Sequence, residues 1–168
     1  MTADGVPVDR EKYSNDDTIS TLNGLIEICK DGQQGFKEAA EGVENSQLKT
    51  TFYEFSQQRA EFAGVLQESV RRLGGDPETS SSVAGAMHRA WVDLKAALTG
   101  GSEEAILNEC ERGEDYAKDA YIKACDEPLP ADIASIVKQQ SQSVLAAHNR
   151  IRDLRNAADR SESAGSGR

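Results

Sequence analysis

Aromatic residues, histidine, cysteine and proline are all scarce in this sequence. Aromatic residues make up 5% of the 168 residues, so a hydrophobic core must be built mainly from aliphatic side chains. The length is typical of a single domain, and the four prolines leave long stretches free to form helices. The three cysteines are an odd number without zinc-finger spacing, which predicts reduced thiols and a cytoplasmic protein.

Positive charge and long apolar runs are also lacking. The formal net charge is −10 and no basic patch or arm offsets it, so we expect no nucleic-acid partner and no anionic membrane surface as a partner. No apolar run approaches the roughly 20 residues that a membrane span needs. The polar, acidic N-terminal sequence has no apolar segment of the kind found in signal peptides. We therefore expect a soluble protein without a secretion signal.

Apolar residues do recur at alternating steps of three and four, which is the pattern of helices packed in a bundle. Five segments show this pattern, and no segment is a convincing strand. Four are long and one is shorter. In chain order they cover about 17–43, 46–73, 79–98, 103 to a point before Pro128, and 131–158. The shorter 79–98 segment carries Trp91, which we expect to be mostly buried as the segment lies across the bundle.

The breaks between these segments predict how the helices are connected. Tight links near 45 and 129 join the long helices into two antiparallel pairs, and the roughly 30-residue middle connection can travel the length of the bundle. The fold class is therefore all-α, a four-helix bundle with an additional short helix in the long crossover between the second and third long helices. We expect the bundle at 16–159, with disordered tails at 1–15 and 160–168.

Each long helix brings a polar residue to mid-height. Counting from the predicted turns places Gln33, Arg59 and Glu114 at one level, with Gln140 about one turn away. We predict a buried ion pair between Arg59 and Glu114, with Gln33 and Gln140 satisfying the remaining donors and acceptors. The alternative is that helix rotation carries Arg59 to the surface, with its stem lying along apolar neighbours.

Mid-height is where ferritin-like bundles hold two metal ions, using Glu-x-x-His pairs from two of their helices. The sequence has two histidines and neither fits, because Leu145 precedes His148 by three positions and Gly85 precedes His88. Arg59 also brings a fixed positive charge to the level where a ligand is needed. We therefore predict no metal and no cofactor.

Six stretches together give a resemblance that covers about residues 17–156. The sequence resembles an uncharacterised family of bacterial ferritin-like four-helix-bundle proteins, a domain-of-unknown-function family, in LNGLIEICKDGQQGFKEAAE, FSQQRAEFAGVLQ, LGGDP, HRAWVDLKAALTG, ECERGEDYAKDAY and AAHNRIRDLR. The resemblance implies a ferritin-like fold and a bacterial source. It implies no established activity, and it assigns no functional residue.

The resulting expectation is a ferritin-like bundle without a working di-iron centre. Its role would be structural, scaffolding or stress-related rather than enzymatic, with a homodimer as the assembly considered and the protein partner unknown. The rival interpretation is a metal-binding oxidoreductase whose degenerate iron site uses Asp31, Glu111, Glu114 and His148. A third is a ligand-binding module that uses the polar layer as a small pocket.

Overall fold

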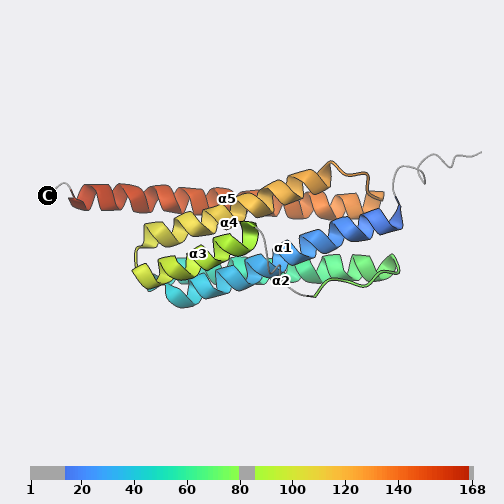
Figure 1. The fold of residues 1–168 in the computed structure, drawn as a ribbon. Helices are drawn as coiled ribbons and strands as arrows, with labels where there is room; N and C mark the ends of the chain where they lie inside the picture. The colour runs from blue at the N-terminus through green and yellow to red at the C-terminus, as the bar shows by residue number, and fades with distance from the viewer. Residues whose placement is uncertain (1–13, 80–85, 167–168) are drawn as a thin grey trace, which may run out of the picture.

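The computed structural model describes the backbone of residues 14–79 and 86–166, without the side chains of 86–91, 162 and 164–166. Every regular element in these ranges is a helix, which confirms the all-α prediction. The helices are α1 (Asn15–Gly42), α2 (Ser46–Arg72), α3 (Ala86–Gly100), α4 (Glu103–Cys125) and α5 (Ala131–Ser166). The four long helices lie side by side, and the shorter α3 lies beside one half of them (Figure 1).

The long helices form two antiparallel pairs, α1 with α2 and α4 with α5, as the tight links predicted (Figure 1). After α2 the chain returns along the bundle, so α4 runs in the same direction as α2. Helix α3 packs on α1 and α4. It lies lengthwise rather than across the bundle, and it begins at Ala86 instead of 79. The predicted burial of Trp91 concerns a side chain outside the described residues, while Leu94 on the same helix is fully buried.

Side-chain caps hold the helix ends in short turns. Asn45 caps α2 by accepting hydrogen bonds from the backbone N–H groups of Gln47 and Leu48, at 2.9 and 3.2 Å. Ser102 caps α4 by accepting from the Ala105 N–H at 3.0 Å. These caps satisfy N–H groups that a helix leaves without partners at its start. Both α2 and α4 therefore begin at defined residues, which fixes the heights of the side chains that follow.

The first part of the crossover, residues 74–79, is fixed to the bundle by two side chains. Asn23 on α1 donates to the Asp76 carbonyl at 3.2 Å and accepts from the Glu78 N–H at 2.8 Å. Gln67 on α2 donates to the Glu78 carbonyl at 2.9 Å. Backbone groups that no helix satisfies thus find partners in the neighbouring helices. Residues 74–79 consequently follow one defined path along α1 and α2.

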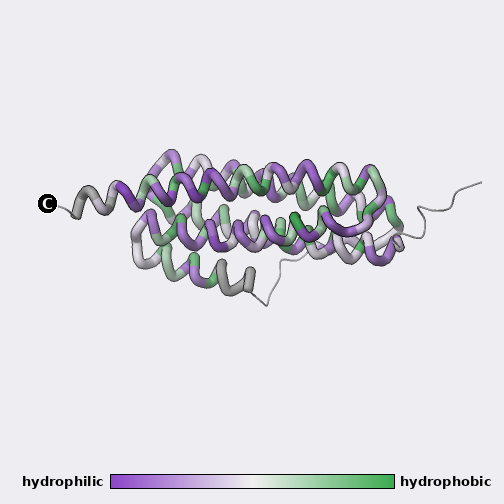
Figure 2. Tube along the Cα trace, turned by 90° about the horizontal axis from the view of Figure 1, so that it is seen from above, coloured by the Kyte–Doolittle hydropathy of each residue, from purple (hydrophilic) through white to green (hydrophobic). Residues whose placement is uncertain are grey.

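Hydrophilic and hydrophobic residues alternate along each helix, as the sequence pattern requires (Figure 2). The buried core is mostly aliphatic. Its aromatic part is a small group in which the Phe36 ring lies 6.1 Å from Phe52 and 5.3 Å from Phe55 between centroids. Within the described residues, no helix has the length and apolar character that a membrane crossing requires.

The C-terminal boundary differs from the prediction. Helix α5 continues to Ser166, so residues 160–166 are helical and not a loose tail. The sequence after Ala158 contains no proline to stop the helix, and polar composition alone does not end one. At the other end, Ser14 caps α1 by accepting from the Asp17 N–H at 3.1 Å. The predicted N-terminal tail falls almost entirely on residues 1–13, which lie outside the described residues.

Candidate functional site

The centre of the bundle contains an ion pair between Arg59 on α2 and Glu114 on α4. Two hydrogen bonds join the two planar groups, from Nη1 to Oε1 at 2.7 Å and from Nη2 to Oε2 at 2.6 Å. Arg59 is 1% exposed and Glu114 is fully buried. This bidentate arrangement is the strongest geometry that a guanidinium and a carboxylate can adopt. The predicted pairing is therefore present, and the alternative of a surface Arg59 is wrong.

The space around the guanidinium is tightly filled. The Arg59 Cζ atom lies 5.5 Å from the centroid of the Phe36 ring, a cation–π distance. Gly32 on α1 faces the same side chain, and a β-carbon at this position would come within 3.2 Å of Nη1. Burial opposes the charge of Arg59, but the charge and hydrogen bonds of Glu114 outweigh it and raise the pKa of Arg59. The guanidinium is therefore held in its charged form.

A second polar group connects all four long helices. Tyr121 on α4 donates from its hydroxyl to Gln140 Oε1 on α5 at 2.7 Å, and its oxygen lies 3.1 Å from the Cys29 sulfur on α1. Gln140 in turn donates from Nε2 to the Phe62 carbonyl on α2 at 3.4 Å. If the Cys29 thiol donates to Tyr121, the thiol and the hydroxyl each have an acceptor for their polar hydrogen. The sequence analysis missed this use of Tyr121, although a tyrosine on a core stripe must find a partner for its hydroxyl.

Burial has the expected effect on these groups. Desolvation raises the pKa of the Cys29 thiol, and it raises the pKa of the Tyr121 hydroxyl well above its ordinary value. It also raises the pKa of Cys110, which is fully buried one turn from Glu114. A thiol with a raised pKa carries little thiolate, so Cys29 and Cys110 are poor nucleophiles. The third cysteine, Cys125, is exposed and unpaired.

Two members of the predicted polar layer are placed differently from the prediction. Gln140 is buried but serves Tyr121 and the Phe62 carbonyl instead of the ion pair. Gln33 is half-buried, and its backbone carbonyl accepts from the Ser56 hydroxyl at 2.7 Å. Among the described residues, no hydrogen bond joins the Gln33 side chain to the ion pair. Periodicity placed Gln33 at the correct height but could not resolve the rotation of α1.

The residues of the alternative metal site are engaged in separate contacts. Glu111 on α4 pairs with Arg155 on α5. Asp115, one turn further, lies 2.7 Å from His148 through Oδ1 and Nε2. These contacts, together with the contacts of Lys118 with Asp115, form a polar strip along the α4–α5 pair. Glu111 and His148 therefore stabilise the packing of two neighbouring helices.

The other two members of that set do not join them. Glu114 engages both carboxylate oxygens with Arg59, and Asp31 is buried on α1. Within the described ranges, no group of three or more histidine, cysteine, aspartate or glutamate side chains is placed so that it could hold one ion. The four residues are consequently not assembled into a single site, and the prediction that they could form one is wrong for this conformation.

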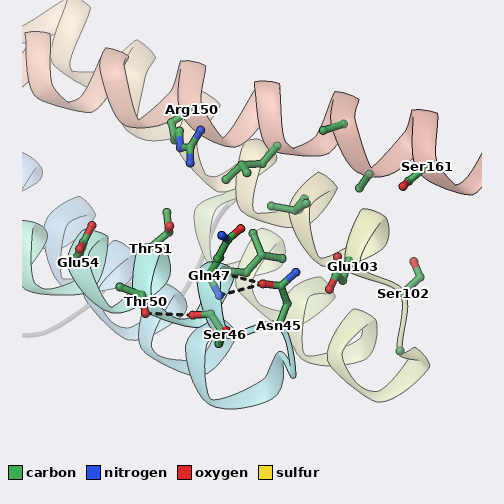
Figure 3. Close-up of a pocket in the computed structure, with 16 residues that line it drawn as sticks. Asn45, Ser46, Gln47, Thr50, Thr51, Glu54, Ser102, Glu103, Arg150 and Ser161 are labelled. Carbon is green, nitrogen blue, oxygen red and sulfur yellow. Dashed lines mark hydrogen bonds between the residues drawn. The ribbon is translucent and has the colours of Figure 1, made fainter.

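A groove opens at the end of the bundle where α2 and α4 begin. It has a volume of about 980 Å³ and lies between the first turns of α2, the start of α4 and the C-terminal half of α5 (Figure 3). None of the polar-layer residues lines it. Its charged side chains are Glu54, Glu103 and Arg150, Asn45 and Gln47 add two amides, and the remaining lining is small, hydroxyl-bearing or apolar. The groove is thus separate from the ion pair.

Comparison with known proteins identifies a family. No curated protein matches the chain. The family described as a domain of unknown function (DUF2383) matches residues 17–127, which run from α1 through α4 and include Arg59 and Glu114. This match covers more than half of the 168 residues. The chain belongs to this family, DUF2383.

Proposed function

We propose that this protein is a ferritin-like four-helix bundle in which an ion pair occupies the place of the metal centre, and that its role is structural or scaffolding. The observation that carries the proposal is the bidentate contact between Arg59 and Glu114 at mid-height. The ferritin-like assignment is supported by two antiparallel helix pairs joined by a long crossover. The pair stabilises the contact between the two halves of the bundle.

Electrostatics argue against a metal at this position. Both oxygens of Glu114 already accept hydrogen bonds from Arg59, so binding a cation there requires breaking them. The displaced guanidinium would then remain buried beside the ion, and two like charges in a low-dielectric interior repel strongly. Arg59 therefore selects against divalent and trivalent cations through its charge as well as through its volume.

The proposed setting is a bacterial cytoplasm, with no nucleic-acid partner. Two observations support it. The three cysteines are free, which suits a reducing compartment. The formal net charge of −10 disfavours binding to phosphate backbones.

Iron binding provides the decisive experiment. Protein purified without chelator is analysed for metals, then titrated anaerobically with iron(II) and exposed to oxygen. We expect no saturable binding and no oxidation signal above that of free iron. About two irons per chain, as a di-iron centre requires, would contradict the proposal if the signal is lost in Glu114→Gln and kept in Asp119→Asn. Asp119 is an exposed carboxylate on the same helix and reports binding to the surface only.

A further inference from the structure

Two buried polar atoms on consecutive residues of α2 have no hydrogen-bond partner among the described residues. They are the Nε atom of Arg59 and the Oε1 atom of Gln58. Arg59 is 1% exposed, and Gln58 is half-buried with its Oε1 atom fully covered. A buried donor or acceptor without a partner is costly, and in native proteins such atoms almost always bind another protein group or an ordered water. One of the two atoms is a donor and the other an acceptor, so a single molecule can satisfy both.

The unsatisfied edge of Arg59 faces away from Gly32. A guanidinium has five N–H donors in one plane, and Glu114 takes one from Nη1 and one from Nη2. The atoms of Arg59 that a β-carbon at Gly32 would approach are Nη1, Cγ and Cδ, which lie along one edge of the side chain. The Nε–H and the outer N–H of Nη2 point together from the opposite edge. This edge therefore presents two parallel donors to a single oxygen atom.

Helix geometry keeps Gln58 from accepting directly from the Nε–H of Arg59. Consecutive residues of a helix point about 100° apart, so their side chains do not face each other. A molecule that joins the two atoms needs a lone pair for the Nε–H and a hydrogen for Oε1. It must also be small, because Phe36 and Gly32 already lie against the guanidinium. Water meets these requirements.

We propose that an ordered water molecule is bound inside the bundle between Arg59 and Gln58. It accepts hydrogen bonds from the Nε–H and the outer Nη2–H of Arg59, and it donates one to Gln58 Oε1. Three hydrogen bonds are typical of an internal water. The water extends the Arg59–Glu114 ion pair to a neutral side chain without adding a charge to the core.

The charges around the site favour water over an ion. A cation would meet the donor edge of a guanidinium. An anion would meet two carboxylates, since Glu114 already binds the same guanidinium and Glu54 lies one turn before Gln58 on α2. Glu54 and Arg150 line the inner end of the groove, away from Ser102 (Figure 3). About one helical turn therefore separates the site from the water of the groove, which gives solvent a short route to it.

The water is tested directly in the full-length protein by a crystal structure and by nuclear magnetic resonance. We expect density for a water within about 3.2 Å of both Arg59 Nε and Gln58 Oε1. In nitrogen-labelled protein, the Nε–H signal of Arg59 should show a cross-peak to a long-lived water. A protein acceptor on Nε in the crystal, or an Nε–H signal without a water cross-peak, would overturn the proposal.

Two glutamine variants test the role of Gln58. Gln58→Met keeps the length of the side chain and removes the acceptor, so the amplitude of the water relaxation dispersion should fall by the contribution of one internal water. Gln57→Met is the matched control, because Gln57 is exposed on the same helix and bonds Glu61 at the surface. The control should leave the amplitude unchanged. An unchanged amplitude in Gln58→Met, or an equal fall in both variants, would show that Gln58 holds no such water.

Discussion

Gly32 on α1 lies against the Arg59 side chain, and the absence of a β-carbon at Gly32 makes room for the guanidinium. A β-carbon there would stand 3.2 Å from Nη1 and 3.3 Å from Cγ of Arg59. Both guanidinium nitrogens that reach Glu114 are held by short hydrogen bonds, so the arginine has little freedom to move away. The ion pair therefore depends on a third helix that contributes no charge to it.

This contact predicts an unusual result for a glycine-to-alanine change. In a helix interior, alanine is favoured over glycine by about 1 kcal/mol. Gly24→Ala should gain up to this amount, because no atom lies within 4 Å of the added carbon. Gly32→Ala should not show this gain, because the added carbon crowds Arg59. We expect it to lower the free energy of unfolding by about 1 kcal/mol or more relative to the parent protein. Urea unfolding of the two variants measures the difference, and equal stabilisation by both would show that Arg59 adjusts freely.

A double-mutant cycle measures the coupling within the ion pair. Arg59→Met or Glu114→Gln alone leaves a buried group without its partner and should cost about 3–5 kcal/mol of stability. The double variant should cost much less than the sum of the two, because both charges are removed together. Additive single effects below about 1 kcal/mol would be incompatible with a buried pair.

Removing one hydroxyl tests the polar chain that joins the four long helices. Tyr121→Phe leaves Gln140 Oε1 and the Cys29 sulfur without their shared partner, so we expect a loss of about 1–3 kcal/mol in chemical denaturation. Tyr116→Phe on the same helix is the control, because Tyr116 is 42% exposed. The control should stay within about 0.5 kcal/mol of the parent protein. Similar effects of the two changes would mean that the buried chain contributes nothing specific.

Stability should fall in alkaline solution. Burial raises the pKa of Cys29 and of Cys110 above the ordinary value of 9.0, and that of Tyr121 well above 10.0. Below pH 9 these groups are protonated in both the folded and the unfolded chain. As the pH rises further, only the unfolded chain loses these protons, so the free energy of unfolding decreases by up to about 1.4 kcal/mol per pH unit for each group.

The contribution of one thiol to this slope is separable. Cys110→Ala will lower stability at every pH through the lost packing of the sulfur. It should nevertheless make the fall in the free energy of unfolding above pH 9 less steep, by the contribution of one ionising group. Unfolding curves at pH 7, 9 and 10.5 for the parent and the variant provide the comparison, and identical slopes would show that Cys110 does not titrate on unfolding.

The sequence was sufficient to place Arg59 opposite Glu114 because helices rise uniformly and the turns near 45 and 102 are short and capped. Counting residues from a fixed end then gives a height. Counting does not give rotation about the helix axis, and for this reason Gln33 and Gln140 were assigned to the wrong partners. The same limit applies to Glu111 and His148, whose partners Arg155 and Asp115 lie on neighbouring faces that only the packed structure defines.

The end of α5 was missed for a different reason. Residues 160–166 are mostly small, with one arginine and one glutamate, and their sequence contains neither a proline nor an apolar stripe that would decide between helix and coil. The extension of the helix beyond Ala158 depends on continuation from an already formed turn, which costs less than starting a new helix. The amino-acid composition of residues 160–166 shows that they have no apolar face to bury. It does not show that they follow a helix that is already formed.

The fixed position of one charge pair also restricts how the two halves of the molecule can meet. An aliphatic seam with a repeat of three and four residues looks nearly the same after a shift of one turn, about 5.4 Å. Such a shift would leave most apolar contacts intact while it separated the Arg59 guanidinium from the Glu114 carboxylate inside a medium of low polarity. The unshifted arrangement is the one in which both charges are neutralised. The pair therefore fixes the register of α2 against α4, and misaligned pairings of the two halves are disfavoured by several kcal/mol.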